Sequence, residues 1–213
     1  GTTSQVELTI KTIRPTWTRS MDVKAWMKGN DYSMILVQSP AKDKGIVFLN
    51  RIKEVWNWLP SLERTIKLPP SMMSQSWMGT DFTNDDLVKE SSIVNDYNHS
   101  IAGDTIIQER TCYIIQMIPK PEAAVVWSKL IVWIDKKDFL ELHTKFYDED
   151  GKLINLMNAY DIKTMDGRLI PTRFEMIPMD KKNQKTEMMY RSIKYNRPIE
   201  DGFFTSEKMK TVS

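Results

Sequence analysis

Residues 77–88, with the sequence WMGTDFTNDDLV, interrupt a chain that otherwise alternates between apolar and polar residues. The stretch is too irregular for a strand and too rich in turn-forming residues for a plain helix. Gly79 can adopt the positive φ that ends a helical turn starting near Met72, and Thr83 or Asn84 can cap a second helix. The two acidic residues after this cap would lie at the positive end of the helix dipole. We therefore expect a helical junction that covers one face of a sheet.

Strand-like segments lie on both sides of this junction. In the first of them Val6, Leu8 and Ile10 alternate with polar residues, which is the pattern of a strand with one apolar face. Asp150-Gly151 and Asp166-Gly167 are hairpin signals, because glycine accepts the positive φ of a primed turn. Further strands are expected around Met34 and Phe48 and over residues 21–27, 54–59, 65–68, 112–118, 129–134, 140–146, 153–162, 170–177 and 186–195.

The fold expected from this pattern is mainly β, of the α+β type, with about ten or eleven antiparallel strands in a barrel or strongly curved sheet. The helical insertion spans about residues 71–102, because apolar residues continue at roughly helical intervals from Leu87 until Gly103. The whole chain, residues 1–213, fits a single domain. Within the insertion, helical spacing places Met73 and Trp77 on one side, facing the interior of the sheet.

Composition limits the classes of partner. The formal charge is +2 with both signs spread along the chain, which gives no indication of a nucleic-acid partner. The chain contains 14 methionines, and methionine is common where a surface adapts to variable apolar partners, although an ordinary core explains the number as well. Cys112 is the single cysteine, so an internal disulfide is excluded, and its apolar neighbours predict a buried, inert thiol.

Catalytic and metal-binding patterns are missing from the sequence. The two histidines, His99 and His143, have no metal-binding spacing, and there is no phosphate-binding glycine loop or nucleophile elbow. Asp81, Asp85 and Asp86 are explained better as capping and helix-dipole residues than as metal ligands or paired catalytic carboxylates. We therefore expect no enzyme activity, no cofactor and no metal.

The junction also carries a family resemblance. Its residues WMGTDFTNDDL resemble the aromatic-Met-Gly-Ser/Thr-Asp-Phe-Ser/Thr signature of the outer-membrane lipoprotein-sorting family, whose fold is shared with the periplasmic carriers LolA and LolB. Trp58-Leu59-Pro60 resembles the aromatic-Leu-Pro segment just upstream in that family, whereas a basic pair expected after the proline is reduced here to Lys67. The resemblance implies an unclosed barrel with a helical lid, and a periplasmic protein whose signal peptide has been removed.

Two functions follow from this resemblance. The first is a periplasmic carrier that shelters lipid or lipoprotein acyl chains in a hydrophobic cavity, with an inner-membrane exporter, an outer-membrane acceptor and peripheral membrane contact as candidate interactions. The second is an interaction module that docks on a membrane lipid exporter and carries no diffusible ligand. A carrier requires a cavity lined by apolar residues, whereas the docking module predicts a filled interior and an exposed apolar patch.

The candidate ligand-binding residues are the aromatic and methionine residues expected near the junction: Trp56, Trp58, Met72, Met73, Trp77, Met78, Phe82 and Trp133. For each of them, the alternative is that it packs in an ordinary hydrophobic core. Gly79 and Asp81 are assigned to building the junction. Asp81 is expected to accept backbone N–H bonds from the start of the second helix, which would set the angle between lid and sheet.

Overall fold

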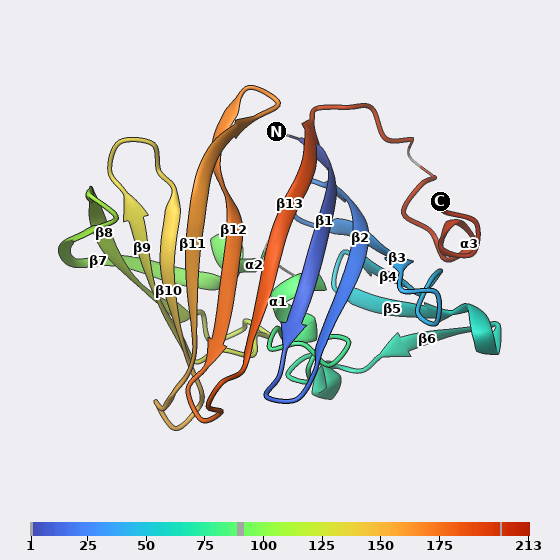
Figure 1. Ribbon diagram of the computed structural model, residues 1–213, viewed down its shortest axis with the longest axis horizontal. Helices are drawn as coiled ribbons and strands as arrows, with labels where there is room; N and C mark the ends of the chain where they lie inside the picture. The colour runs from blue at the N-terminus through green and yellow to red at the C-terminus, as the bar shows by residue number, and fades with distance from the viewer. Residues whose placement is uncertain (1, 89–91, 201) are drawn as a thin grey trace.

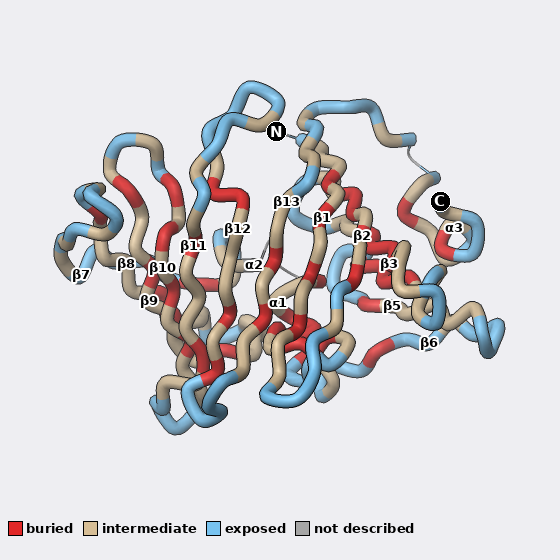
Figure 2. Tube along the Cα trace, in the orientation of Figure 1, coloured by how far each residue is buried: buried red, intermediate tan, exposed pale blue. Residues whose placement is uncertain are grey.

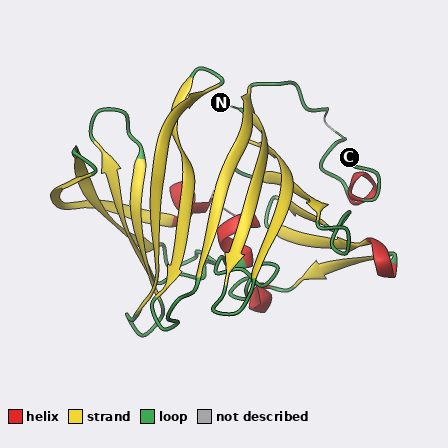
Figure 3. Ribbon diagram, in the orientation of Figure 1, coloured by secondary structure: helices red, strands yellow, loops and turns green. Residues whose placement is uncertain are grey.

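The computed structural model describes residues 2–88, 92–200 and 202–213, and strands dominate it (Figure 3). Thirteen strands form one antiparallel sheet in the order β6-β5-β4-β3-β2-β1-β13-β12-β11-β10-β9-β8-β7. The sheet curves strongly and its end strands, β6 and β7, do not pair with each other (Figure 1). The strands are β1 (Thr3–Ile13), β2 (Thr18–Lys28), β3 (Tyr32–Ser39), β4 (Val47–Arg51), β5 (Glu54–Leu59), β6 (Arg64–Leu68), β7 (Tyr97–Ile107), β8 (Arg110–Pro119), β9 (Lys129–Asp135), β10 (Glu141–Tyr147), β11 (Leu153–Met165), β12 (Arg168–Pro178) and β13 (Lys185–Tyr195).

The predicted antiparallel, unclosed sheet is confirmed, but the predicted count of ten or eleven strands is wrong. The strand that was not predicted is β7, which begins inside the predicted insertion 71–102 and extends beyond it. It pairs with β8 from Tyr97 opposite Pro119 to Ile107 opposite Arg110. Most of β7 is exposed, and a strand with little buried surface shows weak apolar alternation. Backbone pairing with β8 therefore decides its structure.

Helices are short. In the described residues, the sheet is accompanied by two 3-10 turns, η1 (Pro60–Leu62) and η2 (Pro70–Met72), and by three α-helices, α1 (Asn84–Val88), α2 (Ser92–Asp96) and α3 (Ser206–Met209). The predicted insertion also includes residues 89–91, which lie outside the described residues. In Figure 1, α1 and α2 lie behind the central strands of the sheet, whereas α3 lies beside β3 and β4.

The two predicted hairpin turns differ in geometry. Asp166 and Gly167 both have positive φ and join Met165 directly to its partner Arg168, as expected for a two-residue primed turn. In the other turn only Gly151 has positive φ, and the Asp148 carboxylate accepts the backbone N–H groups of Asp150 and Lys152. This second turn is therefore longer and is held by a side chain.

The inner face of the sheet carries the main core. Alternate residues of β1, namely Val6, Leu8 and Ile10, are buried in one cluster with the side chains of Trp77 and Phe82 from the junction. Buried positions are concentrated along the middle of the strands, while turns and edges are exposed (Figure 2). The segment between β6 and β7 therefore packs its apolar residues against the inner face.

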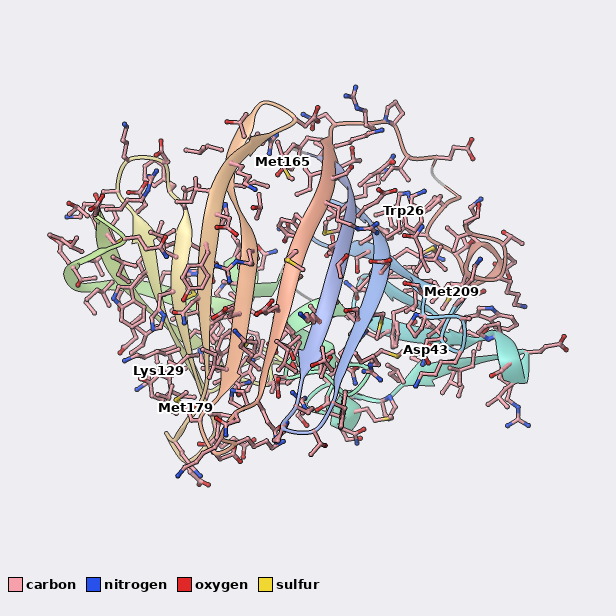
Figure 4. The ribbon with its side chains drawn as sticks, in the orientation of Figure 1. Trp26, Asp43, Lys129, Met165, Met179 and Met209 are labelled. Carbon is pink, nitrogen blue, oxygen red and sulfur yellow. The ribbon has the colours of Figure 1, made fainter. Side chains whose placement is uncertain are left out.

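A second, smaller core lies on the outer face of β2 to β5. Trp26 is buried in this core, where the ring of Phe203 packs against it at a tilt of 54° with ring centroids 5.2 Å apart. Met209 of α3 belongs to the same cluster, and Figure 4 shows Trp26 and Met209 on neighbouring parts of the fold. Thr205 caps α3, because its side chain accepts the N–H of Lys208.

Candidate functional site

The backbone of the junction forms a tight loop. Trp77 N–H donates to the carbonyl oxygen of Phe82 over 2.8 Å, and Ser76 and Thr83 form an isolated antiparallel bridge. Gly79 has φ of +75°, as predicted, but the helical piece expected before it ends at η2, well short of the glycine. Gly79 therefore closes a loop and does not end a helix.

Thr83, one of the two predicted capping residues, builds the cap of α1. Thr83 Oγ1 accepts the N–H of Asp86 over 3.0 Å, while Asp86 Oδ2 accepts the N–H of Thr83 over 2.8 Å. This reciprocal pair is a capping box, with aspartate in place of the usual glutamate. The expectation for Thr83 is thus confirmed, and the predicted capping role of Asp81 is wrong.

Asp81 instead ties the junction to the sheet. Its carboxylate, with 4% of the side chain exposed, pairs with Arg14 over 2.9 Å and accepts the hydroxyl of Thr186 over 2.7 Å. Its backbone N–H donates to Thr186 Oγ1 over 2.9 Å. Arg14 lies in the turn between β1 and β2, and Thr186 lies on β13. We call these three residues the Asp81 latch.

Three further bonds hold the same loop. Arg14 also donates to the carbonyl oxygen of Gly79 over 3.1 Å, and Arg19 donates to that of Met78. Asn155 on β11 donates through its side-chain amide to the carbonyl oxygen of Asp81. The junction is therefore fixed to strands that are far apart in the sequence.

A cavity of about 240 Å³ lies between the junction and the inner face of the sheet. Most of its wall is apolar and comes from alternate residues of the central strands, including Ile10 of β1, Val23 of β2, Met176 of β12 and Met188 of β13. Because these strands pair side by side, their period-2 faces combine into one continuous surface. The chain thus surrounds an apolar space on the inner side of its sheet.

A few polar groups interrupt this wall. Asp86 accepts the indole N–H of Trp127 over 2.7 Å in addition to its bonds in the capping box. Glu141, on β10, accepts the hydroxyl of Thr144. Burial raises the pKa of the Asp86 and Glu141 carboxyls above their ordinary values, since the apolar surroundings disfavour the charged form. Burial and the nearby aspartates also raise the pKa of the Tyr97 hydroxyl.

The structure brings some of the predicted ligand residues to this cavity. Trp77 and Phe82 belong to its wall, and Trp77 is fully buried with its ring 5.5 Å from that of Phe48. Met73 is buried in the same core but is not part of the wall. Met72 and Met78 are partly buried and pack against that core.

The remaining three lie elsewhere, contrary to the predicted grouping. Trp56 and Trp58 pack on the outer face with the cluster that contains Trp26. Trp133 lies in a separate cluster around Cys112, with its ring 4.7 Å from that of His143. The reason is alternation: side chains two residues apart on a strand share a face, and for these strands that face is the outer one.

Sequence reasoning missed most of the cavity wall. The apolar part of the wall comes from alternate residues along each strand. Alternation in the sequence predicts that each strand has one apolar face, but it does not show which of these faces combine around the cavity. Glu141 gave no such signal, because nothing in its neighbourhood distinguishes it from a surface glutamate. Its position beside Thr144 follows from an irregularity in the pairing of β10 with β9 between Glu141 and His143.

Over the described ranges, no three or more His, Cys, Asp or Glu side chains gather closely enough to hold a metal ion. In the same residues, no helix has both the length and the apolar character needed to cross a membrane.

Comparison with known proteins gives a family and a fold. A family model with the description "Uncharacterized protein" matches residues 29–211. No curated protein matches the sequence significantly.

Three solved structures share the fold over almost the whole chain. A DUF1329 family protein from Desulfovibrio piger superposes with a TM-score of 0.89 at 21% identity, covering 98% of this chain and 91% of that one. A LolA superfamily protein from Nitrosomonas europaea superposes with a TM-score of 0.84 at 22% identity, covering 96% of this chain and 90% of that one. A structure described as an outer-membrane lipoprotein-sorting protein domain from Vibrio parahaemolyticus superposes with a TM-score of 0.84 at 20% identity, covering 98% of this chain and 91% of that one. The predicted LolA-like fold is therefore confirmed.

Proposed function

We propose that this chain, which belongs to the family matched over residues 29–211 and has a LolA-like fold, is a carrier of lipid or lipoprotein acyl chains. The apolar cavity between the junction and the inner face of the sheet is the observation that supports this function. In this proposal residues 70–88 and 92–96 form the lid of the cavity, and the Asp81 latch holds the first part of this lid on the sheet.

The size of the cavity sets how much of a chain it accepts in this conformation. Its 240 Å³ exceeds the roughly 150 Å³ of an engineered protein cavity that binds benzene, and lies below the roughly 300 Å³ at which small-molecule pockets begin. If a methylene group needs about the 30 Å³ that a water molecule occupies, the space holds about eight methylenes. A longer chain then requires the lid to move outward.

This length gives a useful affinity without any charged contact. Burial of one methylene contributes about 0.8 kcal/mol, so eight contribute about 6 kcal/mol, which corresponds to a Kd of tens of micromolar. Each methylene added after the lid moves strengthens binding by the same increment, less the cost of moving the lid. A carrier of this kind can therefore load and release its cargo through the lid alone.

The location and partners belong to the same proposal. A LolA-like carrier would work in the periplasm, receive acyl chains from an inner-membrane exporter and deliver them to an outer-membrane acceptor. The neighbour from Vibrio parahaemolyticus, described as a lipoprotein-sorting protein domain, supports this assignment through its fold.

The docking module is the second candidate, and one observation favours it. The edge strand β7 exposes Ile101 and Ile106, with 67% and 71% of their surface accessible, respectively. An edge strand with exposed isoleucines can add a strand from a partner. A protein of this class would bind the exporter but would carry no lipid of its own.

Native mass spectrometry of the protein purified gently from cells distinguishes the two candidates. A carrier should show one or more co-purified masses in the lipid range, which disappear after delipidation. A second measurement follows the binding of a series of acyl probes of increasing chain length. Absence of both co-purified lipid and probe binding would exclude the carrier.

Substitutions that fill the cavity test whether it is the binding site. Ala25 lies in the cavity wall, so Ala25→Leu adds three carbons to the space and should shorten the longest chain accommodated without lid movement by about three methylenes. Ala102→Leu, at an exposed position of β7, is the control and should leave the length dependence unchanged. The cavity assignment fails if both variants bind the whole probe series as the unmodified protein does. Trp77→Asp should also weaken binding, and circular dichroism must show that this variant is folded.

A further inference from the structure

The polar groups in the cavity wall restrict the chemistry of the cargo. Glu141 has a single hydrogen-bond partner among the described residues, Thr144, which donates to Oε1 and leaves Oε2 for a ligand. A buried polar atom without a partner is costly, so a ligand that supplies a partner for Oε2 gains affinity.

The described part of the wall offers no cation to a negative charge. None of its described residues is Lys, Arg or His, whereas Asp85, Asp86 and Glu141 all contribute to it. An ionised carboxylate placed in this space would lose its hydration without gaining a cation, and such a transfer is strongly unfavourable. The carboxylate of a free fatty acid is therefore poorly suited to the cavity.

An uncharged polar group fits these same residues. The raised pKa of the Glu141 carboxyl favours its protonated form, which has a donor as well as an acceptor. A hydroxyl or an ester carbonyl can accept from the protonated Glu141 carboxyl, and a hydroxyl can also donate to it. Both partners then satisfy their hydrogen bonds without any buried net charge.

We propose that the cavity selects acyl lipids whose polar group next to the chain is uncharged, such as an ester or a hydroxyl, over free fatty acids, and that Glu141 is the residue that binds this group. The proposal rests on the proposed carrier function and specifies its substrate class. It concerns the group that enters the cavity and leaves the remainder of the headgroup outside it.

The test uses three ligands with the same ten-carbon chain: decanol, monodecanoylglycerol and decanoate. Each displaces a polarity-sensitive apolar dye from the whole protein at pH 7.5, where decanoate is ionised because carboxyl groups of this kind titrate near pH 4 to 5. Decanol and monodecanoylglycerol should displace the dye at concentrations about ten-fold or more below that of decanoate, because only decanoate brings a charge into the wall.

Variants of Glu141 test the residue itself. Glu141→Leu should weaken the binding of decanol and monodecanoylglycerol about five-fold, the effect of one net hydrogen bond, and should not weaken that of decanoate. Glu141→Gln keeps a donor and an acceptor and should retain the preference for uncharged ligands. Glu7→Gln is the control, since Glu7 lies between Val6 and Leu8 of the wall and its side chain points to the outer face.

The possible outcomes distinguish a failure of the proposed selectivity from a failure of the proposed carrier function. If all three ligands bind equally well, or if decanoate binds best, the selectivity is refuted while the carrier function stands. Unchanged affinity for decanol and monodecanoylglycerol in folded Glu141→Leu refutes the role of Glu141. If no ligand displaces the dye and no lipid co-purifies, the carrier function fails and this inference fails with it.

Discussion

Removal of the Asp81 carboxylate should destabilise the protein more than most single substitutions. In Asp81→Ala, Arg14 loses its ion-pair partner although only 13% of its side chain is exposed, and Thr186 loses the acceptor of its hydroxyl. Breaking a buried ion pair costs about 3 to 5 kcal/mol, and Arg14 keeps its bonds to two carbonyl oxygens, so we expect the lower value, about 3 kcal/mol. For a chain of this size each kcal/mol lowers Tm by about 2 to 4 °C, which gives a decrease of roughly 6 to 12 °C.

A double-mutant cycle shows whether this loss comes from the pair. Thermal and urea unfolding followed by circular dichroism give the free energy of unfolding for Asp81→Ala, Arg14→Met and the double variant. The double variant should be less destabilised than the sum of the single ones by about 1 kcal/mol or more, because the second change removes the uncompensated charge. Asp81→Asn keeps an acceptor for Thr186 and should cost less than Asp81→Ala.

The latch also predicts a kinetic effect. In the folded Asp81→Asn variant, the junction is held less firmly, so a bound acyl probe should dissociate faster than from the unmodified protein. Strictly additive single substitutions, with unchanged probe dissociation, would refute the reasoning that Asp81 and Arg14 act together to hold the junction.

Three further predictions concern the junction and the cavity wall. Gly79→Ala should lower the free energy of unfolding by about 1 kcal/mol or more, because φ is +75° and the new Cβ would contact the Arg19 guanidinium at 3.4 Å; urea unfolding measures this, and unchanged stability would contradict it. Thr83→Ala removes one side of the capping box and should cost about 0.5 to 2 kcal/mol, whereas Thr83→Ser should restore most of it. Glu141 has a folded-state pKa above its ordinary 4.5, so its contribution to stability is complete below that value and is lost as the pH rises through the higher folded-state pKa. Glu141→Gln should therefore show a smaller loss of stability over this rise in pH than the unmodified protein, and identical pH profiles would contradict the assignment.

Local patterns determined much of the architecture. Alternation along β1 predicts both a strand and its buried face, because side chains of a strand point to opposite sides whatever the strand pairs with. The same applies to the turn at Asp166-Gly167, because aspartate tolerates and glycine readily adopts the positive φ that both positions have. The antiparallel sheet and its hairpins could therefore be predicted from residues that are close together in the chain.

The junction shows where local reasoning stops. The positive φ of Gly79 and the cap at Thr83 follow from neighbouring residues, and both were predicted. Asp81 was assigned to the same cap because the residues that follow it in the sequence were predicted to begin a helix. Its actual partners, Arg14 and Thr186, are 67 and 105 positions away, and no local pattern contains them.

What the sequence by itself determined is the period of each strand, the turns and the apolar character of one face, since these depend on sterics within a few residues. The tertiary structure decided which faces meet: it placed Trp77 in the cavity wall, Trp56 on the outer face, and Glu141 within an apolar space. The physical reason is that burial and pKa depend on the groups packed around a side chain. Here strands from the two ends of the chain, β1 and β13, bring those groups together.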